Sequence, residues 1–366
     1  MATGDQLFRP AVNELTPYQP GKPVEDVQRE LGLARVVKLA SNEGPFPPFP
    51  AALEAIEQTA RDLNRYPDGG SYRLHEALAA RHGVAFEQVC AGSGADGCID
   101  ILSQAVLDPG DEVVCGWPSF PSYVIYASKQ GAQTKQVPLR DHRYDLDALA
   151  EAVGSRTKLV YVCHPNNPTG TMNTRSELDA FLERVPEQVL VVIDQAYFEY
   201  IDHPDYPDAV EEYLKRGRRV LVLRTFSKIY GLAGLRVGYA IGPSDVCAAM
   251  AKLRRPFDVT TTAQVAALAS LDDPAEIGRR RALNAEGLVR LAAILRDHGL
   301  EPAGGAVGNF LYIDVGEDAG GLFDRLLHEG VIVRPLGGFG SPTAIRVSVG
   351  TPEENDFFAA ALDRVL

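Results

Sequence analysis

The chain of 366 residues contains only five cysteines and no long apolar stretch. The cysteines are odd in number and form no close pair, as is typical of reduced thiols in the cytosol, so we expect neither disulfides nor a metal site. The longest apolar runs, 246–251 and 357–362, have six residues each, whereas a membrane span needs about 20. The first residues also lack the apolar segment of a secretory signal. We therefore expect a cytoplasmic protein that does not enter a membrane.

Basic residues are scarce relative to acidic ones. There are 36 Lys and Arg against 49 Asp and Glu, which gives a net charge of −13. This balance disfavours nonspecific nucleic-acid binding, because such binding needs cations that replace the counterions of the phosphates. It leaves room for local basic pockets that bind small anions. The length predicts two domains, and an apolar content of 45% provides a large core without disulfides or metals.

Apolar strands alternate with helices in the middle of the sequence. The segments 158–163, 189–193 and 220–224 are apolar except for Lys158 and Arg224 at their ends, which is typical of strands in a largely parallel sheet covered on both faces. After about residue 255, long helices precede a mixed set of short elements. We expect an α/β fold with three parts: an N-terminal arm (1–40), a large domain with a mostly parallel central sheet flanked by helices (41–255) and a smaller α+β domain (256–366).

Lys228 follows the third apolar strand and lies among hydroxyl and glycine residues. An amine just past a buried strand end is partly desolvated, which lowers its pKa and makes it nucleophilic. Arg236 supplies a permanent cation, and Thr225 and Ser227 supply hydroxyl donors. Together these residues suit a bound phosphate beside a lysine that bonds a cofactor covalently. Taken alone, the segment is better explained by a surface lysine in a glycine-rich turn.

Asp194 ends the second apolar strand. A carboxylate after five apolar residues is partly buried and needs a partner. A protonated pyridine nitrogen is one suitable partner, and a helix N-terminus or a salt bridge is another. Tyr197, three residues later, is placed to bring a phenol to the same ring.

Three further strand ends carry candidate residues. In the loop 164–170, Asn167 precedes a proline and is held extended, so its amide is available to a ring oxygen, while His164 is expected to fill the loop. The glycine-rich turn 92–97 lies between a strand and a helix, where it would either bind an anion or merely connect the two elements. Phe120 follows another strand and would either stack on a cofactor ring or pack in the core.

These five features follow predicted strands of one domain, and together they resemble the fold-type I pyridoxal-5′-phosphate (PLP) aminotransferases over essentially the whole chain. Within that family the sequence is most similar to the histidinol-phosphate aminotransferases. The similarity is carried by six segments: LTPYQPG (15–21), LASNEGPFPP (39–48), RYPDGG (65–70), HPNNPTG (164–170), TFSKIYGLAGLRVGY (225–239) and IRVSVGTPEEN (345–355).

The resemblance implies PLP as the cofactor and a homodimer with shared active sites. It assigns roles by position: Lys228 to cofactor attachment and proton transfer, Asp194 to the ring nitrogen, Asn167 and Tyr197 to the ring oxygen, Phe120 to ring stacking, Gly94, Ala95, Thr225, Ser227 and Arg236 to the phosphate, Tyr66 to the cofactor phosphate of the neighbouring subunit, and Tyr18, Asn42, Arg334 and Arg346 to the substrate. Gly97 replaces the glutamate, and Phe120 the tyrosine, that the family often has there.

The implied reaction exchanges the amino group of L-histidinol phosphate with 2-oxoglutarate, giving imidazole acetol phosphate and glutamate, a step of histidine biosynthesis. An aminotransferase for phenylalanine or tyrosine would share every catalytic residue and is the main alternative. A decarboxylase on the same scaffold and a PLP-binding regulator without turnover are two others. The partners expected in each catalytic case are small molecules, namely an amino donor and a 2-oxo acid for a transaminase.

Overall fold

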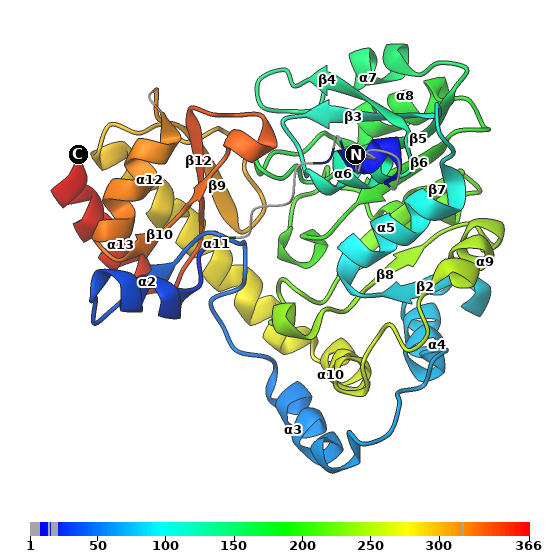
Figure 1. Cartoon of the computed structure of the whole chain (residues 1–366), viewed down its shortest axis with the longest axis horizontal. Helices are drawn as coiled ribbons and strands as arrows, with labels where there is room; N and C mark the ends of the chain where they lie inside the picture. Colours follow the sequence, from blue (N-terminus) through cyan, green and yellow to red (C-terminus); the bar gives the residue numbers. More distant parts are fainter. Residues whose placement is uncertain (1–7, 14, 16–20, 317) are drawn as a thin grey trace, which may run out of the picture.

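The computed structural model describes residues 8–13, 15, 21–316 and 318–366. A larger body with a seven-stranded sheet lies beside a smaller one with a three-stranded antiparallel sheet (Figure 1). The long helix α11 (Pro274–Asp297) packs against both bodies. The expected α/β fold with a mostly parallel central sheet is confirmed. Within the part of the chain that the structure describes, no helix combines the length and apolar composition needed to cross a membrane.

The seven-stranded sheet is parallel except for one strand. Its order is β2 (Val89–Gly92), β8 (Gly238–Ile241), β7 (Val220–Thr225), β6 (Leu190–Asp194), β5 (Thr157–Cys163), β3 (Glu112–Trp117) and β4 (Gln133–Pro138). Only β8 runs antiparallel to its neighbours. Strands β6 and β7 are buried along their whole length, as their continuous apolar composition predicts. The carboxyl ends of β5, β6 and β7 therefore lie side by side at one edge.

Helices cover the sheet on both faces (Figure 1). The larger body contains α3 (Pro50–Thr59), α4 (Tyr72–His82), α5 (Gly94–Val106), α6 (Ser122–Lys129), α7 (Leu146–Ala152), α8 (Arg175–Arg184), α9 (Ser244–Leu253) and α10 (Thr261–Leu271). Short helices are α1 (Pro10–Asn13), η2 (Ala60–Asp62), η3 (Phe86–Gln88), η4 (Phe198–Tyr200), η5 (Val210–Leu214), η6 (Ala233–Leu235) and η7 (Gly337–Phe339). A capping box between Thr174 and Glu177 is present at the start of α8.

The smaller body contains strands from both ends of the chain. Its antiparallel sheet has the order β11 (Arg334–Pro335), β12 (Ala344–Ser348) and β9 (Phe310–Asp314), and β1 (Val37–Lys38) pairs in parallel with β10 (Val331–Ile332). Helices α2 (Val24–Leu31), α12 (Ala319–His328) and α13 (Pro352–Val365) pack around these strands. The segment 331–334 does not form a single strand, because the chain divides there between the two small sheets.

The sequence predicts a division into an arm (1–40), a large domain (41–255) and a small domain (256–366). This division stays a prediction, and the packing of the core indicates where its boundaries could differ. Val37 and Leu39 are buried in the core of the smaller body. Helix α10 contributes Ala263, Ala266 and Leu271 to the core of the larger body. The contacts therefore favour a boundary after α10 and assign the end of the arm to the smaller body.

Candidate active site

The strand ends of the larger body and strands β11 and β12 of the smaller body enclose a cavity of about 370 Å³. The residues predicted for cofactor and substrate from distant parts of the sequence meet there. Those that line the cavity are Asn42, Ala95, Phe120, Asn167, Asp194, Tyr197, Thr225, Ser227, Lys228, Arg236, Arg334 and Arg346. The convergence of so many polar side chains at a strand-end crevice is the arrangement expected of a ligand site in an open α/β sheet.

Lys228 lies just beyond the carboxyl end of β7, and its amine points at the cavity. Its Nζ donates to the carbonyl oxygen of Ser41 at 3.3 Å. Burial, together with the nearby Arg346 guanidinium, lowers the pKa of the amine to about 7. The amine is therefore half neutral near pH 7, which is the state that attacks a carbonyl carbon.

Asp194 is buried at the end of β6, one strand away from Lys228. Its Oδ2 accepts a hydrogen bond from the Tyr123 hydroxyl at 2.7 Å, and its Oδ1 accepts one from the Ala196 amide at 3.1 Å. Burial raises the pKa of this carboxyl, which the hydrogen bonds and Lys228 oppose. A buried carboxylate that lines a cavity is stabilised by a cationic partner there, and a protonated ring nitrogen fits that requirement.

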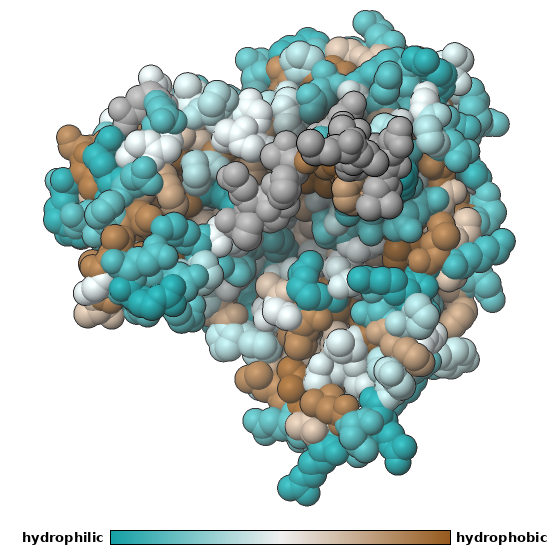
Figure 2. Space-filling view, viewed as in Figure 1, coloured by the Kyte–Doolittle hydropathy of each residue, from teal (hydrophilic) through white to brown (hydrophobic). Residues whose placement is uncertain are grey.

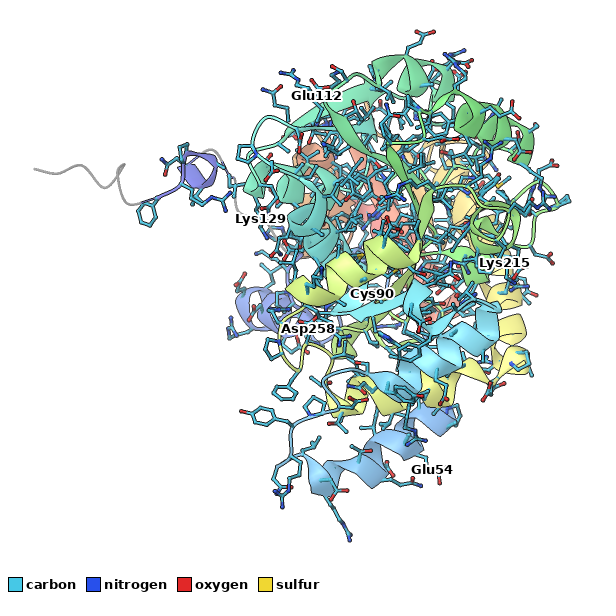
Figure 3. The ribbon with its side chains drawn as sticks, turned by 90° about the vertical axis from the view of Figure 1, so that its right-hand side faces the viewer. Glu54, Cys90, Glu112, Lys129, Lys215 and Asp258 are labelled. Atoms are coloured by element: carbon cyan, nitrogen blue, oxygen red, sulfur yellow. The ribbon has the colours of Figure 1, made fainter. Side chains whose placement is uncertain are left out.

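An anion cradle forms where α5 begins. Gly94 has φ of +78°, and a Cβ built on it would lie 2.8 Å from Nη2 of Arg236, so the arginine crosses the helix N-terminus closely. Arg236 Nη1 also lies 3.4 Å from the Ser227 hydroxyl. The preceding Ser93 amide donates to Asp258, which Figure 3 labels near Cys90 of β2. The helix N-terminus, a guanidinium and hydroxyls together suit a phosphate.

Two arginines of the smaller body stand opposite each other over the cavity. Arg334 of β11 and Arg346 of β12 are paired in the antiparallel register, and both guanidinium groups lie 5.5 Å from the ring of Phe339. Arg346 is buried and donates to the Ala40 carbonyl at 2.6 Å and to Oδ1 of Asn167. Like charges directly opposite each other repel, so an anionic group between them would be bound strongly.

Amide and phenol groups meet on the side of Tyr197. The Tyr197 hydroxyl accepts from Nδ2 of Asn42 at 2.9 Å, and the Lys228 ammonium lies 5.4 Å from the centre of the Tyr197 ring. Because Oδ1 of Asn167 is engaged by Arg346, its Nδ2 is the atom available to a ring oxygen. Phe120 lines the cavity and packs edge-on against Tyr123, with ring centroids 5.6 Å apart.

Of the predicted residues that the structure describes, two do not line this cavity. Tyr66 is 81% exposed and stacks on Phe257 at 4.4 Å, outside the lining of the cavity. Tyr18 lies outside the described residues. Gly94 does not line the cavity itself but precedes Ala95, which does.

Sequence reasoning missed several residues that shape the site. Tyr123 holds Asp194 but lies inside α6, where the sequence showed only a helical segment. Ser348 bonds both the backbone and the side chain of Asn42 and lies two residues after Arg346 on β12. Phe339 packs beneath both arginines. The spacing of Ser348 from Arg346 was the one available signal, since alternate residues of a strand share a face.

The described side chains fit PLP group by group. The cradle at α5 matches a phosphate, and Asp194 matches a ring nitrogen. Asn167 and Tyr197 match the ring oxygen, and Lys228 matches the aldehyde carbon. The side chains that line the cavity therefore match PLP in charge and in hydrogen-bonding groups.

Comparisons with known proteins agree with this geometry. Residues 34–362 match the family model for aminotransferase class I and II. The chain is 44% identical to a histidinol-phosphate aminotransferase of Moorella thermoacetica, over 98% of this chain and 92% of the relative. It is also 44% identical to histidinol-phosphate aminotransferase 2 of Pseudomonas aeruginosa, over 98% of both chains.

Solved structures show the same architecture. A histidinol-phosphate aminotransferase from Sinorhizobium meliloti, in complex with pyridoxal-5′-phosphate, superposes with a TM-score of 0.89 and 32% identity, covering 98% of this chain and 97% of that one. A double mutant of the Thermus thermophilus aspartate aminotransferase gives 0.84 and 26% over 98% of both chains. The match across nearly the whole length, in sequence and in fold, shows that the chain belongs to the aminotransferase class I and II family.

Proposed function

We propose that the protein is a PLP-dependent aminotransferase that exchanges the amino group of L-histidinol phosphate with 2-oxoglutarate, giving imidazole acetol phosphate and glutamate, in histidine biosynthesis. One observation carries the proposal: Lys228, Asp194 and the opposed arginines Arg334 and Arg346 line the same cavity. The names of the relatives from Moorella thermoacetica and Pseudomonas aeruginosa support this choice of substrate.

The side chains divide the work between binding and proton transfer. When bound, PLP supplies an electron sink for the bond that breaks at the substrate carbon. Arg236 and the start of α5 hold the phosphate, and Asp194 keeps the ring nitrogen protonated. Lys228 Nζ is the base at the substrate carbon that bears the amino group, because its pKa near 7 lets it take up and release a proton at neutral pH.

The two arginines account for two different substrates in one pocket. A guanidinium binds carboxylate and phosphate alike through a bidentate fork. Arg334 and Arg346 would therefore hold the phosphate of histidinol phosphate in one half-reaction and a carboxylate of glutamate in the other. On this side the cavity is bordered by the buried side chain of Phe339 and the buried strand β12.

The substrate assignment is tested by comparing amino donors on the purified enzyme with 2-oxoglutarate as acceptor. We expect kcat/KM to be higher for L-histidinol phosphate than for phenylalanine or tyrosine, with glutamate formed in step with donor consumption. A ratio that favours phenylalanine would replace histidinol phosphate by the aromatic alternative and leave the transamination chemistry standing. Release of carbon dioxide would indicate a decarboxylase.

Replacing Arg346 with alanine should reduce kcat/KM by about 30- to 1000-fold in both half-reactions, since a buried charge-assisted contact contributes roughly 2–4 kcal/mol. The kcat/KM for phenylalanine should fall as well, because its carboxylate would bind the same guanidinium group. Steady-state kinetics with each donor and acceptor measures the loss. The matched control is Arg290→Ala, which removes a half-exposed arginine paired with Asp356 and should leave kcat/KM unchanged. A loss confined to one half-reaction would contradict the shared pocket.

We also propose a homodimer whose sites are completed by Tyr66 of the neighbouring subunit. Several large apolar side chains within and between α3 and α4 are exposed: Leu53, Leu63, Tyr66 and Tyr72 at 41%, 53%, 81% and 56%, together with Phe257 at 43%. Figure 2 shows hydrophobic surface gathering near α3, and Figure 3 shows α3 with Glu54 at the edge of the molecule. Exposed apolar side chains in one region of the surface support an interface with a second copy.

The shared site predicts complementation between two defective chains. Tyr66→Phe removes one hydrogen bond to a charged phosphate and should weaken PLP binding roughly 10- to 100-fold. In a heterodimer, one chain carries Tyr66→Phe and the other carries Lys228→Ala. The site with the intact Lys228 then receives the intact Tyr66 of the other chain, so this site should bind PLP with wild-type affinity.

The measurement is activity against PLP concentration for the heterodimer and both parents, with Tyr72→Phe as the control for an exposed tyrosine. If the heterodimer needs the same PLP concentration for activity as the Tyr66→Phe parent, Tyr66 acts in the site of its own subunit. A monomer in sedimentation equilibrium that retains full activity would rule out shared sites.

We propose that the protein is located in the cytoplasm, because its cysteines are free thiols. All five are buried and free of disulfides, and such thiols are typical of a reducing compartment. Fractionation of the native host, with the protein detected by antibody, tests this location.

A further inference from the structure

Asn42 occupies a strained and fully enclosed position between the two bodies. Its φ is +55°, in the left-handed region that asparagine tolerates better than most residues. Only 1% of its surface is exposed. Its backbone is held at both ends, since its amide donates to Oγ of Ser348 at 3.0 Å and its carbonyl accepts from Nδ2 of Asn309 at 3.1 Å. Such a position persists only where the surroundings fix it.

The hydrogen bonds that join Ser348, Asn42 and Tyr197 each have a defined donor and acceptor. The Ser348 hydroxyl accepts a hydrogen bond from the backbone amide of Asn42 at 3.0 Å and donates one to Oδ1 of the Asn42 side chain at 2.9 Å. Oδ1 is a carbonyl oxygen and can only accept. The other end of the Asn42 side chain is then Nδ2, a donor, and it lies 2.9 Å from the Tyr197 hydroxyl.

The direction continues to Tyr197. Its oxygen accepts from Asn42, so its own hydrogen is available to an acceptor in the cavity that Tyr197 lines. We infer that Ser348 is a positioning residue that, through Asn42, makes Tyr197 a hydrogen-bond donor to the ring oxygen of the bound cofactor. This relay (Ser348, Asn42 and Tyr197) rests on the proposed function, because it presupposes PLP in the cavity.

The relay also links substrate binding to the cofactor. Ser348 lies two residues after Arg346 on β12, and alternate residues of a strand share a face. Strand β12 of the smaller body therefore carries both Arg346, which is proposed to bind the substrate, and Ser348, which orients Tyr197 through Asn42. The charged and titratable groups around Tyr197 are Arg346 from β12, Asp194 from β6, Cys163 from β5 and Lys228 beyond β7. The Ser348 and Asn42 side chains add no charge to this set.

The test is an absorbance titration of the PLP-loaded enzyme. A donor at the ring oxygen stabilises the anionic form of that oxygen and so lowers the pKa at which the visible band of the bound cofactor changes. In Ser348→Ala, the Asn42 amide loses its fixed orientation, and we expect this spectral pKa to rise by about half a unit to one unit, the size of one net hydrogen bond. Ser348→Cys keeps the volume with a weaker donor and should shift it in the same direction.

Two controls separate the relay from a merely structural effect. Ser270→Ala removes another buried hydroxyl, which bonds the Ala266 carbonyl on α10, and should leave the spectral pKa unchanged. In the double variant Ser348→Ala/Tyr197→Phe, the spectral pKa should equal that of Tyr197→Phe alone, because the relay acts only through the phenol.

The outcomes distinguish the relay from the proposed function. A wild-type titration that Ser348→Ala and Ser348→Cys both leave unchanged would overturn the relay alone. Additive shifts in the double variant would also overturn it. A wild-type protein that binds no PLP would overturn the proposed function and the relay together.

Discussion

Replacing Lys228 with alanine should abolish transamination, with a loss of roughly 10⁴-fold or more, the scale seen when a covalent nucleophile and base is removed. The amine performs two tasks, attachment of the cofactor and proton transfer at the substrate carbon, and no second amine takes part in the described lining of the cavity. The measurement is glutamate formation from L-histidinol phosphate and 2-oxoglutarate. The matched control, Lys215→Ala, removes an amine paired with Glu211 on the surface and should retain full activity.

Chemical trapping and pH provide two independent checks on the same lysine. Borohydride reduction of the wild type should fix PLP to the peptide that contains Lys228, and a label on another lysine would refute the assignment. Because burial lowers the amine's pKa to about 7, the neutral form is lost below that pH and dominates above it. The rate at which the cofactor-free enzyme captures PLP should therefore rise between about pH 6 and pH 8.

Asp194→Asn should lower turnover by at least ~10²-fold while PLP still binds, as expected for the loss of one preorganised electrostatic group. The substitution keeps the shape of the side chain and removes the charge that holds the ring nitrogen protonated. The Tyr123 hydroxyl can still donate to the remaining amide oxygen, so the position should stay ordered. Single-turnover kinetics with the loaded enzyme separates this slow chemistry from weak binding.

The control for charge loss alone is Asp245→Asn, which removes an exposed carboxylate paired with Arg219. It should leave turnover and PLP binding unchanged. Near-normal turnover in Asp194→Asn would show that the ring nitrogen does not depend on this carboxylate.

Residues next to apolar strands were the most predictable part of the site. Asp194 and Thr225 end strands whose continuous apolar composition is visible in the sequence, and parallel strands present their carboxyl ends at one edge. Lys228 follows the same edge within three residues. The parallel sheet and the positions of these side chains therefore follow from periodicity and chain direction alone.

Features that depend on three-dimensional pairing were not predictable in this way. Tyr123 lies inside a helix, and nothing in its neighbours indicates that its hydroxyl reaches Asp194. The segment 331–334 has strand-like composition throughout, yet its two halves join different sheets because β1 arrives from the other end of the chain. The place of Tyr66 in a neighbouring site rests on resemblance, since its surroundings in one chain show only the stacking on Phe257.

The pairing of β1 with β10 has a consequence for synthesis of the protein. Val37 and Val331 are partners although 294 residues (331 − 37) separate them along the chain. At about 5–20 residues per second on the ribosome, Val37 waits roughly 15 to 60 s for its partner to be made. The sheet of the larger body has all its strands well before that time. The cavity combines Asn42 with Arg346, so the active site cannot be complete until the chain has been made at least as far as Arg346.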